Sequence, residues 1–156
     1  MILYIVRHGK AKSEQEDPSR SLTDEGKEET RRIASFLKKY GVQADEIWHS
    51  TKKRAEETAE ILKSQSGLTA AMKAKDHLAP NSQPHIVYDE ILKENKNVMI
   101  VGHLPFLDRL VSLFITGDEM KGIVKFKESA VAILEQDVPP AWRIAGHITP
   151  EMAGGL

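Results

Sequence analysis

The chain contains no cysteine, carries almost no net charge and has no long apolar run. The absence of cysteine excludes disulfides, thiolate zinc sites and cysteine nucleophiles, and it fits a reducing compartment. A formal net charge of −1 over 156 residues provides neither the basic surplus of a nucleic-acid-binding protein nor a polybasic membrane patch. No apolar stretch approaches the length of a transmembrane helix, and the short N-terminal run lacks the preceding basic residues of a signal peptide. We therefore expect a soluble, cytoplasmic protein with no nucleic-acid partner and no membrane partner.

What the chain does contain is an alternation of strand and helix signals. Short runs rich in β-branched residues predict strands, and apolar positions three and four residues apart predict helices. Strands are expected at Leu3–Val6, Glu46–His49, Ala71–Lys75, Val98–Val101, Ala130–Glu135 and Trp142–Ile148. Helices are expected from Thr23 as N-cap to Gly41, from Ser50 or Thr51 to Gly67, from Pro84 to Glu94 and from Leu104 to Gly117. This order predicts a single domain over residues 1–156, an α/β three-layer sandwich with a mostly parallel sheet and an antiparallel edge strand.

Helix ends and faces add local detail. Ser50 or Thr51 is predicted to cap the second helix, because a short hydroxyl side chain can accept from a free backbone N–H. Pro105 is expected in the first turn of the last helix. Leu92 is expected on the buried side of its helix, and Ile144 on the buried face of an edge strand.

Three of the predicted turns carry polar side chains at the same edge of the sheet. Arg7-His8-Gly9 follows the first strand, Ser50–Arg54 follows the second, and Gly102-His103 follows the strand at Val98–Val101. Open α/β sheets bind ligands at this edge, and the amino ends of the helices that follow favour anions. Histidine is a nucleophile or proton carrier near neutral pH, and arginine offers a fork that fits phosphate. We therefore expect a pocket for a dianion, with a phosphoryl group as the obvious occupant, formed by Arg7, His8, Arg54 and His103.

These side chains belong to four motifs that resemble those of the histidine phosphatase superfamily, also called phosphoglycerate-mutase-like. The motifs are Arg7-His8-Gly9, Leu22-Thr23-Asp24-Glu25-Gly26, Ser50…Arg54-Ala55…Thr58-Ala59 and Val101-Gly102-His103. They occur in the family's order over nearly the whole chain. The compact length and the Gly102-His103-Leu104-Pro105 version of the last motif are most similar to the small SixA-type phosphohistidine phosphatases.

The resemblance implies a role for each candidate residue. His8 would attack phosphorus through a ring nitrogen and form a phosphohistidine intermediate that water later cleaves. Arg7, Arg54 and His103 would hold the non-transferring oxygens and offset the charge that spreads over them. Gly9 would take part in substrate binding. Because side chains supply the positive charge, we expect neither a metal nor another cofactor.

The acid that many relatives use to protonate an ester leaving group has no clear counterpart. The loop after the third strand reads Asp76-His77-Leu78-Ala79-Pro80-Asn81 and contains no glutamate, which leaves Asp76 and His77 as candidates. Phosphohistidine needs less help from an acid, because its ring can carry a proton before the P–N bond breaks. We therefore predict a monomeric phosphatase for phosphohistidine in proteins. The alternatives are a phosphatase for small phosphate esters and a catalytically silent phosphate-binding module.

The remaining histidines lack support from any motif, and no pair of them has a short metal-ligand spacing. A structural or solvated position is expected for His49, His77, His85 and His147. Packing roles are expected for Trp48 and Trp142.

Overall fold

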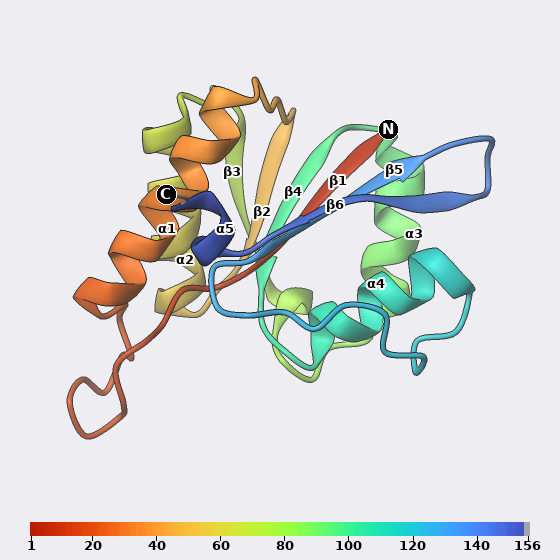
Figure 1. Cartoon of the computed structure of the whole chain (residues 1–156). Coiled ribbons are helices and arrows are strands. Elements are labelled where there is room, and N and C mark those ends of the chain that lie inside the picture. The colour runs from red at the N-terminus through yellow and green to blue at the C-terminus, as the bar shows by residue number, and fades with distance from the viewer. Residues whose placement is uncertain (155–156) are drawn as a thin grey trace.

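A computed structural model describes residues 1–154, whose six strands form one sheet in the order β3-β2-β4-β1-β5-β6 (Figure 1). The strands are β1 (Ile2–Arg7), β2 (Glu46–Ser50), β3 (Ala71–Lys75), β4 (Val98–Gly102), β5 (Val131–Gln136) and β6 (Trp142–Ile148). The first four pair in parallel, whereas β5 pairs antiparallel with both β1 and β6. The predicted α/β class, with a mostly parallel sheet and antiparallel pairing at one edge, is confirmed.

Helices cover both faces of the sheet (Figure 1). One face packs against α1 (Asp24–Lys39), α2 (Lys53–Ser66) and the short α5 (Pro150–Ala153), and the other against α3 (Pro84–Glu94) and α4 (Phe106–Thr116). Successive residues of a strand point to opposite faces. In β1, Leu3 and Ile5 accordingly join the core beneath α3 and α4, while Tyr4 and Val6 join the core beneath α1 and α2. None of the helices in residues 1–154 combines the length and apolar character needed to cross a membrane.

Several helix ends lie where local chemistry predicts them. The Thr23 side chain accepts a hydrogen bond from the backbone N–H of Gly26 and caps α1. Gly67 and Gly117 end α2 and α4 with φ values of +74° and +79°, in the left-handed region that glycine adopts without steric cost.

Two predicted helix starts are wrong. The N-cap of α2 is Lys52, which makes no side-chain capping bond, so neither Ser50 nor Thr51 caps this helix. Ser50 still lies within β2, because its backbone continues the parallel ladder with β3. Pro105 is the N-cap of α4 and precedes its first turn.

Two apolar side chains predicted to be buried are exposed. Leu92 is 39% exposed because it lies beside, and not within, the α3 stripe that buries Val87 and Ile91. Ile144 is 41% exposed on the edge strand β6, whose register with β5 shifts at Ile133/Leu134 and interrupts the simple alternation. A 3-10 helix, η1 (Asp76–Leu78), and α5 occur where no helix is predicted.

Candidate active site

The C-terminal ends of β1 and β4 bring two histidines together. Arg7 and Gly102 are partners in the register of the two strands, and the backbone N–H of His8 donates to the Gly102 carbonyl at 2.9 Å. The ring centroids of His8 and His103 consequently lie 4.9 Å apart. Both side chains are buried, with His8 8% and His103 2% exposed. His8 and His103, 95 positions apart in the chain, thus lie in the same buried site, because the parallel pairing of β1 and β4 aligns the turns that follow these strands.

The His8 ring is held in one tautomer. Its Nδ1 lies 2.7 Å from the carbonyl oxygen of Gly9, which can only accept, so Nδ1 carries the hydrogen. Nε2 therefore keeps its lone pair. Burial lowers the pKa of His8 to about 4, and the nearby positive charges of Arg54, Arg7 and Arg20 contribute in the same direction. His8 is therefore a neutral imidazole with a free nitrogen lone pair near neutral pH.

His103 is held by a hydroxyl group of the second motif. Its Nε2 lies 2.8 Å from Oγ of Ser50, and the same oxygen accepts from the backbone N–H of Lys52 at 3.2 Å. Nδ1 of His103 is buried and has no hydrogen-bond partner among residues 1–154. Burial lowers the pKa of His103 to about 3, with further lowering by His8 and by the charges of Arg54, Lys52 and Arg20. Ser50 thus holds one nitrogen of the ring and leaves the other free to contact a ligand.

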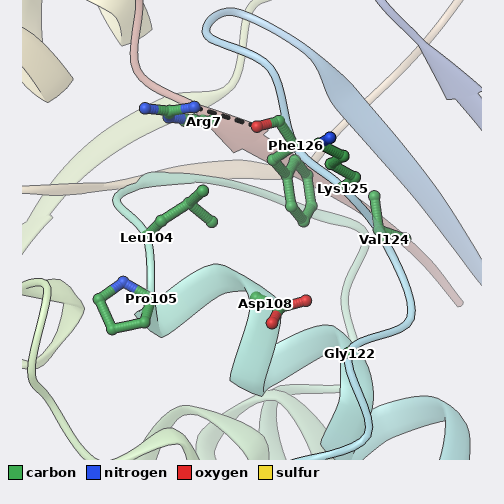
Figure 2. Close-up of a pocket in the computed structure, with 8 residues that line it drawn as sticks. All are labelled: Arg7, Leu104, Pro105, Asp108, Gly122, Val124, Lys125 and Phe126. Carbon is green, nitrogen blue, oxygen red and sulfur yellow. Dashed lines mark hydrogen bonds between the residues drawn. The ribbon is translucent and has the colours of Figure 1, made fainter.

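Two arginines present hydrogen-bond donors that the protein does not use. Nη1 of Arg7 donates to the carbonyl of Phe126 at 3.0 Å, the bond drawn in Figure 2. Nε of Arg7 and Nε of Arg54 are buried and have no partner within the described part of the chain. Buried donors normally find an acceptor in a folded protein. Unused guanidinium donors beside two neutral imidazoles suit an anion with several oxygens, such as a phosphoryl group.

Gly9 connects the turn after β1 to α2. Its N–H donates to Oγ1 of Thr58 at 2.9 Å, and that hydroxyl donates to the carbonyl of Arg54 at 2.7 Å. A Cβ at position 9 would lie 2.9 Å from Oγ1 of Thr30 and 3.0 Å from Oγ of Ser129. The N–H that a substrate oxygen would need is therefore already engaged. Gly9, predicted as a substrate-binding residue, permits a close approach of this turn to α1 and Ser129, while its N–H is linked through Thr58 to the carbonyl of Arg54.

Arg20 is a site residue that sequence reasoning misses. It lies in the irregular loop before α1, where its Nε donates to the carbonyl of Lys12 at 3.1 Å. Burial is the main cause of the lowered pKa values of His8, Arg54 and His103, and the positive charge of Arg20 contributes to all three in the same direction. The loop has no periodicity and several other charged residues, so nothing in the sequence singles this arginine out.

The two candidates for a general acid occur in η1, after β3. Asp76 is exposed, whereas Nε2 of His77 lies 2.8 Å from a carboxylate oxygen of Glu90 on α3. The second oxygen of Glu90 binds Nζ of Lys75. His77 is therefore tied to α3 through a carboxylate that already has a cationic partner.

The other histidines lie outside this cluster of contacts. The Nδ1 atom of His49 bonds the Ser50 carbonyl within the buried strand β2, and His85 is an exposed residue of α3. Among residues 1–154, no group of three or more histidine, aspartate or glutamate side chains is arranged to hold a metal ion.

Comparison with known proteins gives a consistent result. The model of the histidine phosphatase superfamily (branch 1) matches residues 3–79. The phosphohistidine phosphatase SixA of Escherichia coli (strain K12) is 29% identical over 142 residues, which cover 88% of this chain and 86% of SixA.

Solved structures agree over the full fold. A structure of the protein histidine phosphatase SixA complexed with tungstate superposes with a TM-score of 0.85 and 28% identity, covering 96% of this chain and 97% of the other. The putative SixA of Agrobacterium tumefaciens has the same fold, with a TM-score of 0.79, 23% identity and coverage of 96% and 97%. Together with the motifs, these similarities show that the chain belongs to the histidine phosphatase superfamily and is a phosphohydrolase.

Proposed function

We propose that this protein hydrolyses phosphohistidine in other proteins through a phosphorylated His8 intermediate. The observation that carries the proposal is the buried His8 ring, whose Nδ1–H is engaged by Gly9 and whose Nε2 lone pair is free beside His103. A neutral nitrogen surrounded by cationic donors is the nucleophile that phosphoryl transfer requires.

In the first step Nε2 of His8 attacks phosphorus. A new P–N bond forms as the bond from phosphorus to the leaving nitrogen breaks, and that bond's electron pair goes to the departing imidazole. Arg7, Arg54 and His103 would bind the three non-transferring oxygens, using the donors that the protein leaves free. A Ser50 hydroxyl that donates to Nε2 of His103 puts the ring hydrogen on Nδ1, where it can meet a phosphoryl oxygen.

In the second step water attacks phospho-His8. The P–Nε2 bond breaks, inorganic phosphate leaves, and His8 returns to its neutral state. Loss of one preorganised donor in such a site typically lowers kcat by about a hundredfold to a thousandfold.

Two observations support a phosphoramidate substrate: the similarity to SixA, and the lack of a well-placed general acid, among residues 1–154, to protonate an ester leaving group. A departing imidazole that already carries a hydrogen on its other nitrogen leaves as a neutral molecule. An alkoxide would need a proton, yet Asp76 is exposed and His77 is bound to Glu90. Phosphatases for small esters share the fold, as shown by the putative α-ribazole-5′-P phosphatase of Escherichia coli with a TM-score of 0.77 and 14% identity. A small phosphate ester is therefore the second candidate substrate.

The test compares wild type and His8→Ala on a phosphohistidine-bearing carrier protein and on p-nitrophenyl phosphate. Wild type should release phosphate from the carrier with the higher kcat/KM, and wild type quenched in alkaline denaturant, in which the P–N bond is stable, should retain phosphate on His8. His8→Ala should lose both signals, while the matched control His85→Ala, altered at an exposed position of α3, should keep them. Full turnover by His8→Ala would reject the nucleophile. Phosphate binding without turnover on any substrate would instead indicate a silent binding module.

A further inference from the structure

A groove of about 540 Å³ opens beside Arg7, between the start of α4 and the loop that leads to β5 (Figure 2). Leu104 and Pro105 form one side, and Val124 and Phe126 form the other. Figure 2 shows Asp108 between these two sides, with Arg7 at the opposite end. The groove thus combines apolar walls with a single carboxylate.

Asp108 has no polar partner within residues 1–154. No hydrogen bond or ion pair to its carboxylate occurs there, and Lys125, the other cation that lines the groove with Arg7, is not within ion-pair distance. The residue is half-buried in the first turn of α4, and burial raises its pKa. The amino end of α4 favours a negative charge at this position, and because no group of the described residues binds the carboxylate, its oxygens remain available to accept from a ligand in the groove.

The groove adjoins the site of phosphoryl transfer. Arg7 lines the groove and also offers its Nε, unpaired within the described part of the chain, to the proposed phosphoryl site, and Leu104 of the groove continues the turn that carries His103. A substrate whose phosphoryl oxygens contact Arg7 and His103 has this groove beside it for the group that is displaced. The apolar walls suit a flat ring, and a volume of about 540 Å³ holds an imidazole together with neighbouring atoms of a polypeptide.

We infer that Asp108 selects the leaving group by accepting a hydrogen bond from the second ring nitrogen of the substrate's phosphohistidine. This inference rests on the proposed function and names the residue that distinguishes N–P from O–P substrates. When the P–N bond breaks, its electron pair goes to the nitrogen that leaves, and the hydrogen on the other nitrogen stays in place opposite Asp108. The carboxylate remains an unprotonated acceptor throughout. An aryl phosphate has no N–H to offer and leaves as an anionic oxygen, which the carboxylate's charge disfavours.

The test measures kcat/KM of wild type, Asp108→Asn and Asp108→Ser on free phosphohistidine and on p-nitrophenyl phosphate. Asp108→Ser should lose about tenfold to a hundredfold on phosphohistidine, the range for a hydrogen bond to a charged group, and Asp108→Asn, whose amide oxygen is an uncharged and weaker acceptor, should lose less. Their kcat/KM on p-nitrophenyl phosphate should stay the same or rise. The matched control Asp89→Asn removes one carboxylate from an exposed position of α3 and should change neither value.

Activity on the ester reports that each variant is folded and has an intact phosphoryl site. A selective loss on phosphohistidine confirms the inference. An equal loss on both substrates, or no loss on either, overturns it and leaves the proposed function standing. Wild type that hydrolyses the ester but not phosphohistidine would refute the proposed function, and the role of Asp108 with it.

Discussion

Replacing His8 with asparagine should flatten the pH dependence of stability. Burial lowers the folded-state pKa of His8 from 6.5 to about 4. Its neutral form therefore contributes stability that is fully present above pH 6.5 and is lost as the pH falls toward 4. Between about pH 8 and about pH 5 the unfolded chain takes up a proton at this residue and the folded chain does not, which lowers the free energy of unfolding by about 2 kcal/mol.

His103 adds a second contribution of the same sign. With a folded-state pKa of about 3, it also remains neutral at a pH where the unfolded chain is protonated. Its share over the same interval is again about 2 kcal/mol, so wild type should lose about 4 kcal/mol from the two histidines together. His8→Asn should lose about 2 kcal/mol less than wild type over this interval, because asparagine does not titrate. Asparagine can still donate a hydrogen bond to the carbonyl of Gly9.

Urea unfolding of both proteins at the two pH values measures the difference. His8→Gln, a second neutral amide, separates the loss of titration from any effect of asparagine on packing. If both variants show the wild-type difference to within about 0.5 kcal/mol, His8 takes up a proton as readily when folded as when unfolded, and the argument from burial fails.

Three further substitutions test residues that position the site, bind phosphate or pack beside it. Ser50→Ala removes the hydroxyl on Nε2 of His103 and should lower kcat about tenfold or more with little change in KM, since the ring loses its orientation; steady-state kinetics with unchanged kcat would contradict this. Arg20→Ala should weaken inhibition by inorganic phosphate about tenfold, as expected for a lost charge-assisted contact; an unchanged inhibition constant would place Arg20 outside the phosphate site. Gly26→Ala brings a Cβ into the backbone of Lys10 and should destabilise the fold by about 1–3 kcal/mol. Thermal unfolding measures the effect of Gly26→Ala. An unaltered midpoint would contradict the prediction and show that the backbone at Lys10 moves to accommodate the added Cβ.

Much of the fold could be predicted because it depends on local and periodic features. Apolar runs and helical spacing identify the six strands and the four longer helices, and residues such as Thr23 and Gly67 mark the ends of helices by their own chemistry. The short elements η1 and α5 could not be predicted in this way, because three or four residues carry no period. Ile144 keeps its strand but not its burial, since no sequence pattern reports the register shift between β5 and β6 that interrupts the alternation.

The order of strands and helices along the chain is sufficient to predict that Arg7, His8 and His103 lie in turns at one edge of a parallel sheet. How these groups act depends on contacts that become visible once the chain is folded. The bond between His103 and Ser50 across 53 residues and the position of Asp108 in the groove depend on contacts between distant segments, and the tautomer of His8 depends on a local backbone conformation that the sequence pattern does not report. The spacing of apolar residues predicts each helix or strand separately. Which residue a side chain contacts depends on how the helices and strands pack against one another, and no local sequence pattern predicts that packing.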